Sequence, residues 1–228
     1  MLLLAIDTSG KNGTLALARA SESGFDVLEL VPLAGRMYSA QLIPELQNAL
    51  ARQNLAKSDI DGYVVASGPG SFTGLRVGLS TGKALSEVLH KPIAAVSVLE
   101  AAARMTACSG HVIVTLDAGR KQMFVGDHEF SVEFKIKRAQ ESLVGYEEFF
   151  DSVHGSRAKL FSPDAIVREA ANTHSVTIAA CLAPEADTFA RIGYQKLRAG
   201  ETTPAETLEA NYIRASDAEL FSLPKLMP

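Results

Sequence analysis

The sequence predicts an α/β protein of two lobes, each a mixed sheet with flanking helices. Short apolar runs alternate with helical patterns along the chain, which is typical of α/β domains. The first half opens with three strand-like runs before its first helix. A unit of apolar strand, aspartate, turn and return strand then occurs twice, at Asp7 and at Asp117. These observations favour a duplicated two-lobed fold.

The first lobe is expected to span residues 1–108. Residues 2–7, 14–20 and 25–31 have the pattern of three strands. A helix after Ser39, a strand at 63–65, a helix after residue 72 and a strand at 93–96 follow. Ser97-Val98-Leu99-Glu100 is a capping box that opens a helix ending near Cys108. The predicted order is β-β-β-α-β-α-β-α.

The second lobe is expected to span residues 109–228. Strands are predicted at 112–116, 122–126, 130–136 and 174–178, and helices after Pro163 and over 184–197. A further capping box begins at Thr203. We expect the tail around Tyr212 to return to the first lobe.

Composition excludes several classes of protein. The chain has 228 residues, is 47% hydrophobic and carries a formal net charge of -4 at pH 7. The acidic composition argues against a protein that binds nucleic acid by itself, because such binding normally needs a basic surface. Its two cysteines, Cys108 and Cys181, are far apart and fit reduced thiols of the cytosol. With no secretion signal and no apolar run of membrane-spanning length, we expect a cytoplasmic protein.

A row of small residues follows a Gly/Ser loop that joins a strand to a helix. Each helical glycine costs about 0.8–1 kcal/mol relative to alanine, so a row of them needs a compensating gain. Close approach of another backbone supplies one, and the steric logic is that of small-xxx-small helix pairs. We therefore expect a partner protein to pack on this face. The expected interface residues are Gly70, Gly74, Leu75, Gly78, Leu79, Gly82 and Ser86, with Leu42 and Leu46 of the preceding helix.

The Gly/Ser loop and the helix after it partly resemble three known motifs: the dinucleotide fingerprint, the P-loop and the nucleophile elbow. The loop is one residue longer than the dinucleotide fingerprint and lacks P-loop spacing. Residues 78–82 match G-x-S-x-G with Ser80 at the centre, but a nucleophile elbow needs its serine on a strand-to-helix turn. Here the pattern falls inside the predicted helix, which disfavours a serine nucleophile.

No metal site is expected, because no two of the five histidines are separated by three residues. Asp7 and Asp117 have two interpretations: each caps its own turn, or the two face a nucleotide's metal from both lobes. Ser9 joins them as a candidate nucleotide contact, although no cofactor is required. A small basic patch of Lys135, Lys137 and Arg138 fits a solvated strand face better than a tRNA contact.

Residues 67–78, SGPGSFTGLRVG, closely resemble the signature of the TsaB (YeaZ) family. Further matching stretches are LLLAIDTS (2–9), KPIAAVSVLE (91–100), DAGRKQMF (117–124) and NYIR (211–214). Tyr38, where relatives often carry histidine, and Ala210, in place of a common proline, depart from the family pattern. The resemblance implies the two-lobed actin-like ATPase (ASKHA) fold.

The resemblance also implies a function. TsaB proteins are non-catalytic subunits in the synthesis of threonylcarbamoyladenosine at A37 of tRNA. The resemblance implies pairing with the catalytic TsaD subunit through first-lobe helices, recruitment of the ATPase TsaE, and a homodimer when the chain is alone. Contact with tRNA would be indirect, and binding of ATP or ADP weak. TsaD carries an H-x-x-x-H metal site, which this sequence lacks. The alternative is a stand-alone hydrolase, an M22 glycoprotease or an ATPase, that uses Ser80 or the two aspartates.

Overall fold

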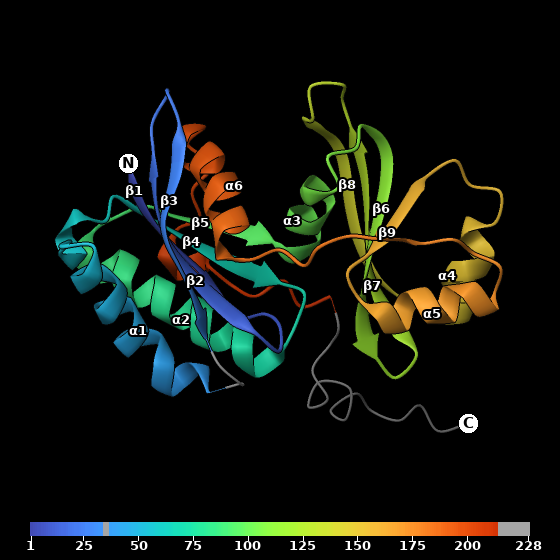
Figure 1. Ribbon diagram of the computed structural model, residues 1–228, viewed down its shortest axis with the longest axis horizontal. Coiled ribbons are helices and arrows are strands. Elements are labelled where there is room, and N and C mark those ends of the chain that lie inside the picture. Colours follow the sequence, from blue (N-terminus) through green and yellow to red (C-terminus); the bar gives the residue numbers. More distant parts are fainter. Residues whose placement is uncertain (34–36, 214–228) are drawn as a thin grey trace.

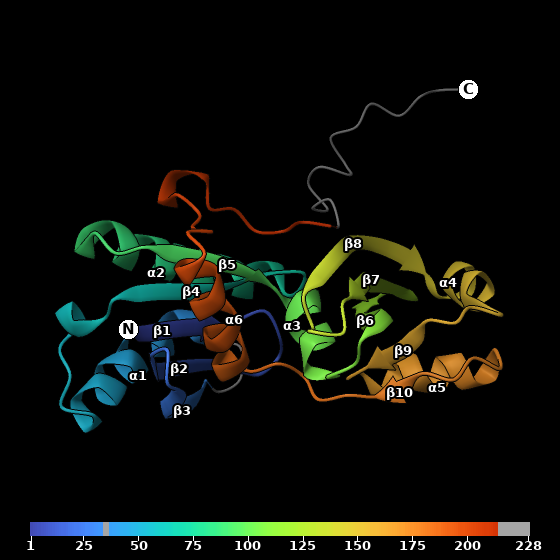
Figure 2. The ribbon, with the colours of Figure 1, turned by 90° about the horizontal axis from the view of Figure 1, so that it is seen from above.

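The computed structural model describes residues 1–33 and 37–213, and the chain forms two lobes (Figure 1 and Figure 2). The elements of the first lobe are β1 (Leu2–Asp7), β2 (Gly13–Ala20), β3 (Phe25–Leu33), α1 (Tyr38–Arg52), a 3-10 turn (Lys57–Asp59), β4 (Gly62–Gly68), α2 (Phe72–Leu89), β5 (Ile93–Ser97) and α3 (Val98–Met105). The predicted order of this lobe is confirmed.

The second half of the chain follows its predicted pattern less closely. Its elements are β6 (Gly110–Gly119), β7 (Gln122–Phe130), β8 (Ile136–Gly145), α4 (Tyr146–Val153), β9 (Lys159–Ser162), α5 (Ala165–Thr173), β10 (Ala179–Ala180), α6 (Ala186–Arg198) and a 3-10 turn (Ala205–Thr207). The predicted strand at 130–136 is wrong, because the turn between β7 and β8 lies there, closed by a hydrogen bond from Ser131 N to Lys135 O of 2.8 Å. The strand predicted at 174–178 is also wrong, since β10 begins only at Ala179.

The two sheets repeat one topology. The first has the order β3-β2-β1-β4-β5, and the second, written from its other edge, has the order β8-β7-β6-β9-β10. In both, the first three strands pair antiparallel and the last two add in parallel. The first strand of each lobe is therefore central. This duplication confirms the predicted two-lobed α/β fold.

Helices cover both faces of the first sheet. Helices α1 and α2 cover one face and α6 the other (Figure 1). Side chains of β1 alternate between them, so Leu4 joins the core under α1 and α2, whereas Ala5 joins the cluster that contains Phe189 of α6. Helix α6 lies so close that a Cβ on Gly193 would overlap Val64.

Helix α6 belongs to the part of the chain that the sequence assigned to the second lobe, yet it packs on the first sheet. The division at residue 108 itself stays a prediction. The physical reason for the placement of α6 is the small-residue surface of β1 and β2, onto which its aromatic and branched side chains fit. The following segment runs back along β5, where Thr203 N donates to Ile93 O at 2.9 Å.

Helix α3 stands between the lobes. Its alanines Ala102 and Ala103 pack against Val112, Val114 and Phe130 of the second sheet. The opposite face of that sheet carries α4 and α5. The junction of the lobes is therefore built on small side chains of one helix.

Candidate functional site

The glycine face of α2 packs inside the first lobe. A Cβ on Gly74 would overlap the carbonyl oxygen of Thr8, and a Cβ on Gly78 would overlap its hydroxyl. On Gly82 it would lie 2.5 Å from Val65 Cγ1. Glycine thus lets α2 lie directly on β1 and β4. The sequence correctly indicated a close backbone approach but placed it at a partner protein, whereas the structure shows the chain's own sheet there.

The rest of the predicted interface is internal in the same way. Its buried members are Leu42, Leu46, Leu75, Leu79 and Ser86. Gly70 is exposed, but a Cβ on it would overlap the carbonyl of Ser9. A partner could reach the buried members only by displacing the core. Partner binding by α1 and α2 therefore stays a prediction, and it requires their other faces.

The outward faces of α1 and α2 carry exposed apolar side chains. Ile43 of α1 is 41% exposed, and Phe72 and Val88 of α2 are 39% and 74% exposed. A shallow groove of about 480 Å³ lies between the helices, lined by Ser39 of α1 and by residues of α2 that include Phe72 and Arg76. This face combines apolar groups, hydroxyls and one guanidinium.

The C-terminal segment completes this face at the start of α2. The ring of Tyr212 packs on Phe72, with centroids 5.1 Å apart, and Arg76 Nε donates to the Tyr212 hydroxyl at 3.1 Å. The Arg76 guanidinium lies 3.7 Å from the centroid of the Phe72 ring. Arg214, the last residue of the NYIR stretch, lies outside the described residues.

Asp7 is a buried carboxyl at the end of the central strand β1. Its Oδ1 accepts hydrogen bonds from Ser9 N at 2.8 Å and from Ser9 Oγ at 2.6 Å. Burial raises the pKa of Asp7 to about 6, against the opposing effect of the Ser9 hydrogen bonds; Glu185 raises it further. Asp7 therefore caps its own turn, and it keeps a raised pKa of the kind that clusters at functional sites.

Asp117 occupies the equivalent place in the second lobe. Its Oδ1 accepts from Gly119 N at 2.9 Å and from the Tyr146 hydroxyl at 3.0 Å. Within residues 1–33 and 37–213, no hydrogen bond joins Asp7 to Asp117. The turn-capping interpretation is observed for both aspartates. Nucleotide contact by Asp7, Ser9 and Asp117 stays a prediction.

Ser80 lies in the middle of α2, exposed, and not at a strand-to-helix turn. The described residues that line its groove include no imidazole and no carboxylate. Across the described ranges, no group of three or more His, Cys, Asp or Glu side chains is placed to hold a metal ion. No helix in these ranges is long and apolar enough to cross a membrane.

Sequence reasoning missed Glu141 of β8, which joins three parts of the molecule. Its carboxylate accepts hydrogen bonds from Ser97 Oγ at the start of α3 and from Asn211 Nδ2 at 2.5 Å. Asn211 N in turn donates to Ser67 O at 2.7 Å. The partners of Glu141 lie 44 and 70 residues away along the chain, so no local pattern could mark it.

Known proteins resemble this chain in sequence. The family described as TsaD: tRNA N6-adenosine threonylcarbamoyltransferase matches residues 31–220. The tRNA threonylcarbamoyladenosine biosynthesis protein TsaB of Bacillus subtilis is 36% identical over 131 residues, which are 57% of this chain and 56% of that protein. TsaB of Haemophilus influenzae is 25% identical over 181 residues, 78% of this chain and 71% of that protein. In the first of these matches the chain spans about half the length of its curated relative.

Solved structures show the fold. A Pseudomonas aeruginosa protein described as similar to the peptidase YEAZ has a TM-score of 0.76 at 24% identity, covering 93% of this chain and 99% of that one. YeaZ from Pseudomonas aeruginosa has a TM-score of 0.70 at 22% identity, covering 92% and 100%. The family match over residues 31–220 and the TsaB relatives show that the chain belongs to the TsaD family, tRNA N6-adenosine threonylcarbamoyltransferase, as one of its TsaB (YeaZ) members.

Proposed function

We propose that this chain is a non-catalytic subunit in the synthesis of N6-threonylcarbamoyladenosine at A37 of tRNA. It pairs with a TsaD-type catalytic subunit, recruits a TsaE-type ATPase, and forms a homodimer when alone. It acts in the cytoplasm and contacts tRNA only through its partners. Family membership supports this role, as do the names of relatives described as biosynthesis proteins of this nucleoside.

The observation that carries the pairing is the outward face of α1 and α2. Exposed Ile43, Phe72 and Val88 give this helix pair an apolar surface that its own sheet does not cover. Exposed apolar side chains on paired helices are a feature of surfaces that bind another protein. The glycines act behind that surface, because they seat α2 on β1 and so fix the height and tilt of the outward face.

The positions of the candidate reactive groups support a non-catalytic role. Ser80 sits within a helix, where the strained turn of a nucleophile elbow does not occur. The carboxylates of Asp7 and Asp117 are engaged in capping their own turns. The sequence also lacks the H-x-x-x-H spacing that the resemblance attributes to the catalytic subunit.

The test is light scattering after size exclusion, on the chain alone and mixed with the TsaD-type protein of the same organism. We expect a homodimer that gives way to a one-to-one heterodimer. Ile43→Glu should weaken the heterodimer at least tenfold, because a charge enters the apolar surface. Ile166→Glu is the matched control, since Ile166 is an isoleucine 56% exposed on α5 of the second lobe.

Two results would contradict the proposal in different ways. A wild-type chain that ignores the TsaD-type protein removes the scaffold role altogether. A heterodimer that forms equally well with Ile43→Glu and Ile166→Glu keeps the role but places the interface away from α1.

A further inference from the structure

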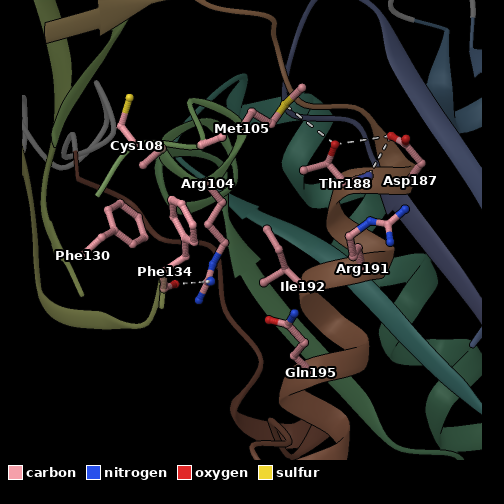
Figure 3. Close-up of a pocket in the computed structure, with 12 residues that line it drawn as sticks. Arg104, Met105, Cys108, Phe130, Phe134, Asp187, Thr188, Arg191, Ile192 and Gln195 are labelled. Atoms are coloured by element: carbon pink, nitrogen blue, oxygen red, sulfur yellow. Dashed lines mark hydrogen bonds between the residues drawn. The ribbon is translucent and has the colours of Figure 1, made fainter. Parts of the chain in front are cut away.

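A pocket lies at the junction of the two lobes, on the α6 side of the first sheet and away from α1 and α2. Its volume is about 340 Å³, and it is lined by side chains from α3, α6 and the segment around the β7–β8 turn (Figure 3). Small-ligand pockets occupy roughly 300–1,000 Å³ and occur preferentially at such junctions. The pocket is thus large enough for a small organic molecule.

The walls of the pocket are mainly apolar. Met105 extends from the end of α3, Ile192 from α6, Phe130 from the end of β7 and Phe134 from the β7–β8 turn. Figure 3 shows these side chains around one opening, with the charged groups of α6 at its edge. An occupant therefore needs an apolar body.

Some of the charged side chains at the edge of the pocket form ion pairs and others do not. Arg104 pairs with Glu100 at 3.0 Å, and Glu100 also pairs with Lys196 at 3.0 Å. This triad holds two cations and one anion. Asp187 Oδ1 accepts from Thr188 N at 2.7 Å, at the start of α6, where the helix dipole favours a negative charge.

Arg191 also lines the pocket, and it differs from Arg104 and Lys196 in its pairing. Its guanidinium lies 4.3 Å from the centroid of the Phe25 ring. Within the described part of the chain, Arg191 makes no ion pair. A guanidinium held by a ring at the edge of an apolar pocket is suited to a carboxylate, which its forked N–H groups match in geometry.

Phe134 adds an independent observation. Its φ is +58°, in the left-handed region that glycine or asparagine normally occupies in hairpin turns. Its side chain is 48% exposed, and its carbonyl accepts from Arg104 at 3.5 Å. A bulky residue in this conformation is a local strain, of the kind that collects at ligand sites. Here it holds an aromatic ring at the pocket wall.

We propose that this junction pocket binds a small amphipathic anion, with an aromatic or branched apolar body between Phe134 and Ile192 and one carboxylate paired with Arg191. The proposal is independent of partner binding by α1 and α2, because the pocket lies on the other side of the first sheet. Either can fail without the other.

The test uses the full chain and two probes, 1-naphthaleneacetate and its neutral amide. The chain has no tryptophan, so naphthalene fluorescence reports binding directly. We expect saturable binding of the carboxylate, at least about tenfold tighter than the amide. Arg191→Gln should remove that difference, since it removes the charge-assisted pair. Arg198→Gln is the control, because Arg198 is on the same helix but pairs with Glu22 at 3.1 Å, outside the pocket.

A second variant separates binding from folding. Phe134→Gly relieves the left-handed strain and removes the ring, so thermal stability should hold or rise while both probes bind more weakly. The proposal is overturned if the carboxylate does not saturate the wild-type chain, or if it binds no tighter than the amide. It is equally overturned if Arg191→Gln behaves like Arg198→Gln, or if Phe134→Gly binds like the wild type.

Discussion

Thr8 and Gly74 are joined by a hydrogen bond of 2.7 Å from the threonine hydroxyl to the glycine carbonyl, across 66 residues of sequence. The bond ties the turn after β1 to the first part of α2. It is possible because residue 74 has no side chain, and the carbonyl of Thr8 occupies the place of a Cβ. The position of α2, and hence of its outward face, depends on this contact.

Gly74→Ala should destabilise the chain by about 1–3 kcal/mol, despite the better helix propensity of alanine, because the added methyl group forces α2 away from β1. The measurement is the free energy of unfolding in urea. Gly24→Ala is the control, since a Cβ there meets nothing within 4 Å. A Gly74→Ala variant as stable as Gly24→Ala would show that α2 can shift without cost.

Asp7→Asn should stabilise the chain at neutral pH. Burial raises the pKa of Asp7 from its ordinary value of 3.8 to about 6 in the folded chain, so the folded state binds the proton more tightly. The contribution of protonated Asp7 to the free energy of unfolding is fully present below about pH 3.8 and is lost as the pH rises through 6. Asparagine stays neutral and can still accept from Ser9, so it avoids this loss.

The gain from Asp7→Asn should be about 1–3 kcal/mol at pH 7 and near zero at pH 4. Urea unfolding of both proteins across this range measures it. Ser9→Ala gives a comparison of opposite sign, because it removes a hydrogen bond that stabilises the charged carboxylate. A pH-independent difference between Asp7→Asn and the wild type would contradict burial as the cause.

The first lobe could be predicted from local patterns because its strands and helices alternate regularly and their ends are marked by capping and turn residues. Ser97 begins α3 as expected, accepting from Leu99 N and Glu100 N. The glycine spacing in α2 likewise predicted a close approach correctly. The spacing does not identify the neighbouring backbone, because a helix face without side chains can pack on a sheet or on another helix equally well. Only the fold shows that Thr8 lies there.

The secondary structure of the second half of the chain was harder to predict for a physical reason. Strand β8 alternates poorly, with residues 137–140 all exposed at a sheet edge, so no period-2 signal marks it. The residues around Phe134 have high strand propensity but form a turn, where tertiary contacts override propensity. Glu141 was missed for the same reason, because its three-way contact exists only when both lobes and the tail are assembled.

Glu141→Ala should loosen the C-terminal segment before it affects the rest of the chain. The carboxylate holds Asn211 and Ser97, and hydrogen bonds to charged groups contribute about 1.5–3 kcal/mol each. Amide hydrogen exchange should therefore accelerate over residues 201–213. Glu133→Ala is the control, because Glu133 is exposed and pairs with Lys135 at 3.2 Å, away from the C-terminal segment. Equal exchange in the two variants would show that the tail is held by its contacts with Ser67 and β5 alone.

His128→Phe should remove a loss of stability at acidic pH. His128 is fully buried, its ring stacks on Phe130 with centroids 5.8 Å apart, and neither ring nitrogen has a hydrogen-bond partner in the described residues. Burial lowers the pKa of His128 below 6.5, against the weaker opposing effects of the nearby Gly126 backbone and then of the carboxylates of Glu141, Glu100 and Asp127. The unfolded chain therefore binds the proton more tightly than the folded one.

Neutral His128 contributes stability that is fully present above pH 6.5 and is lost as the pH falls through the pKa of His128 in the folded chain. This pH dependence is opposite in sign to that of Asp7. Phenylalanine cannot be protonated and fits the same stacked site, so the advantage of His128→Phe over the wild type should grow between pH 7.5 and 5. Urea unfolding at these two values measures it, with the exposed His154→Phe as control. An advantage that is the same at both pH values would place the effect in apolar packing against Phe130, and the protonation of His128 would then have no part in the stability of the lobe junction.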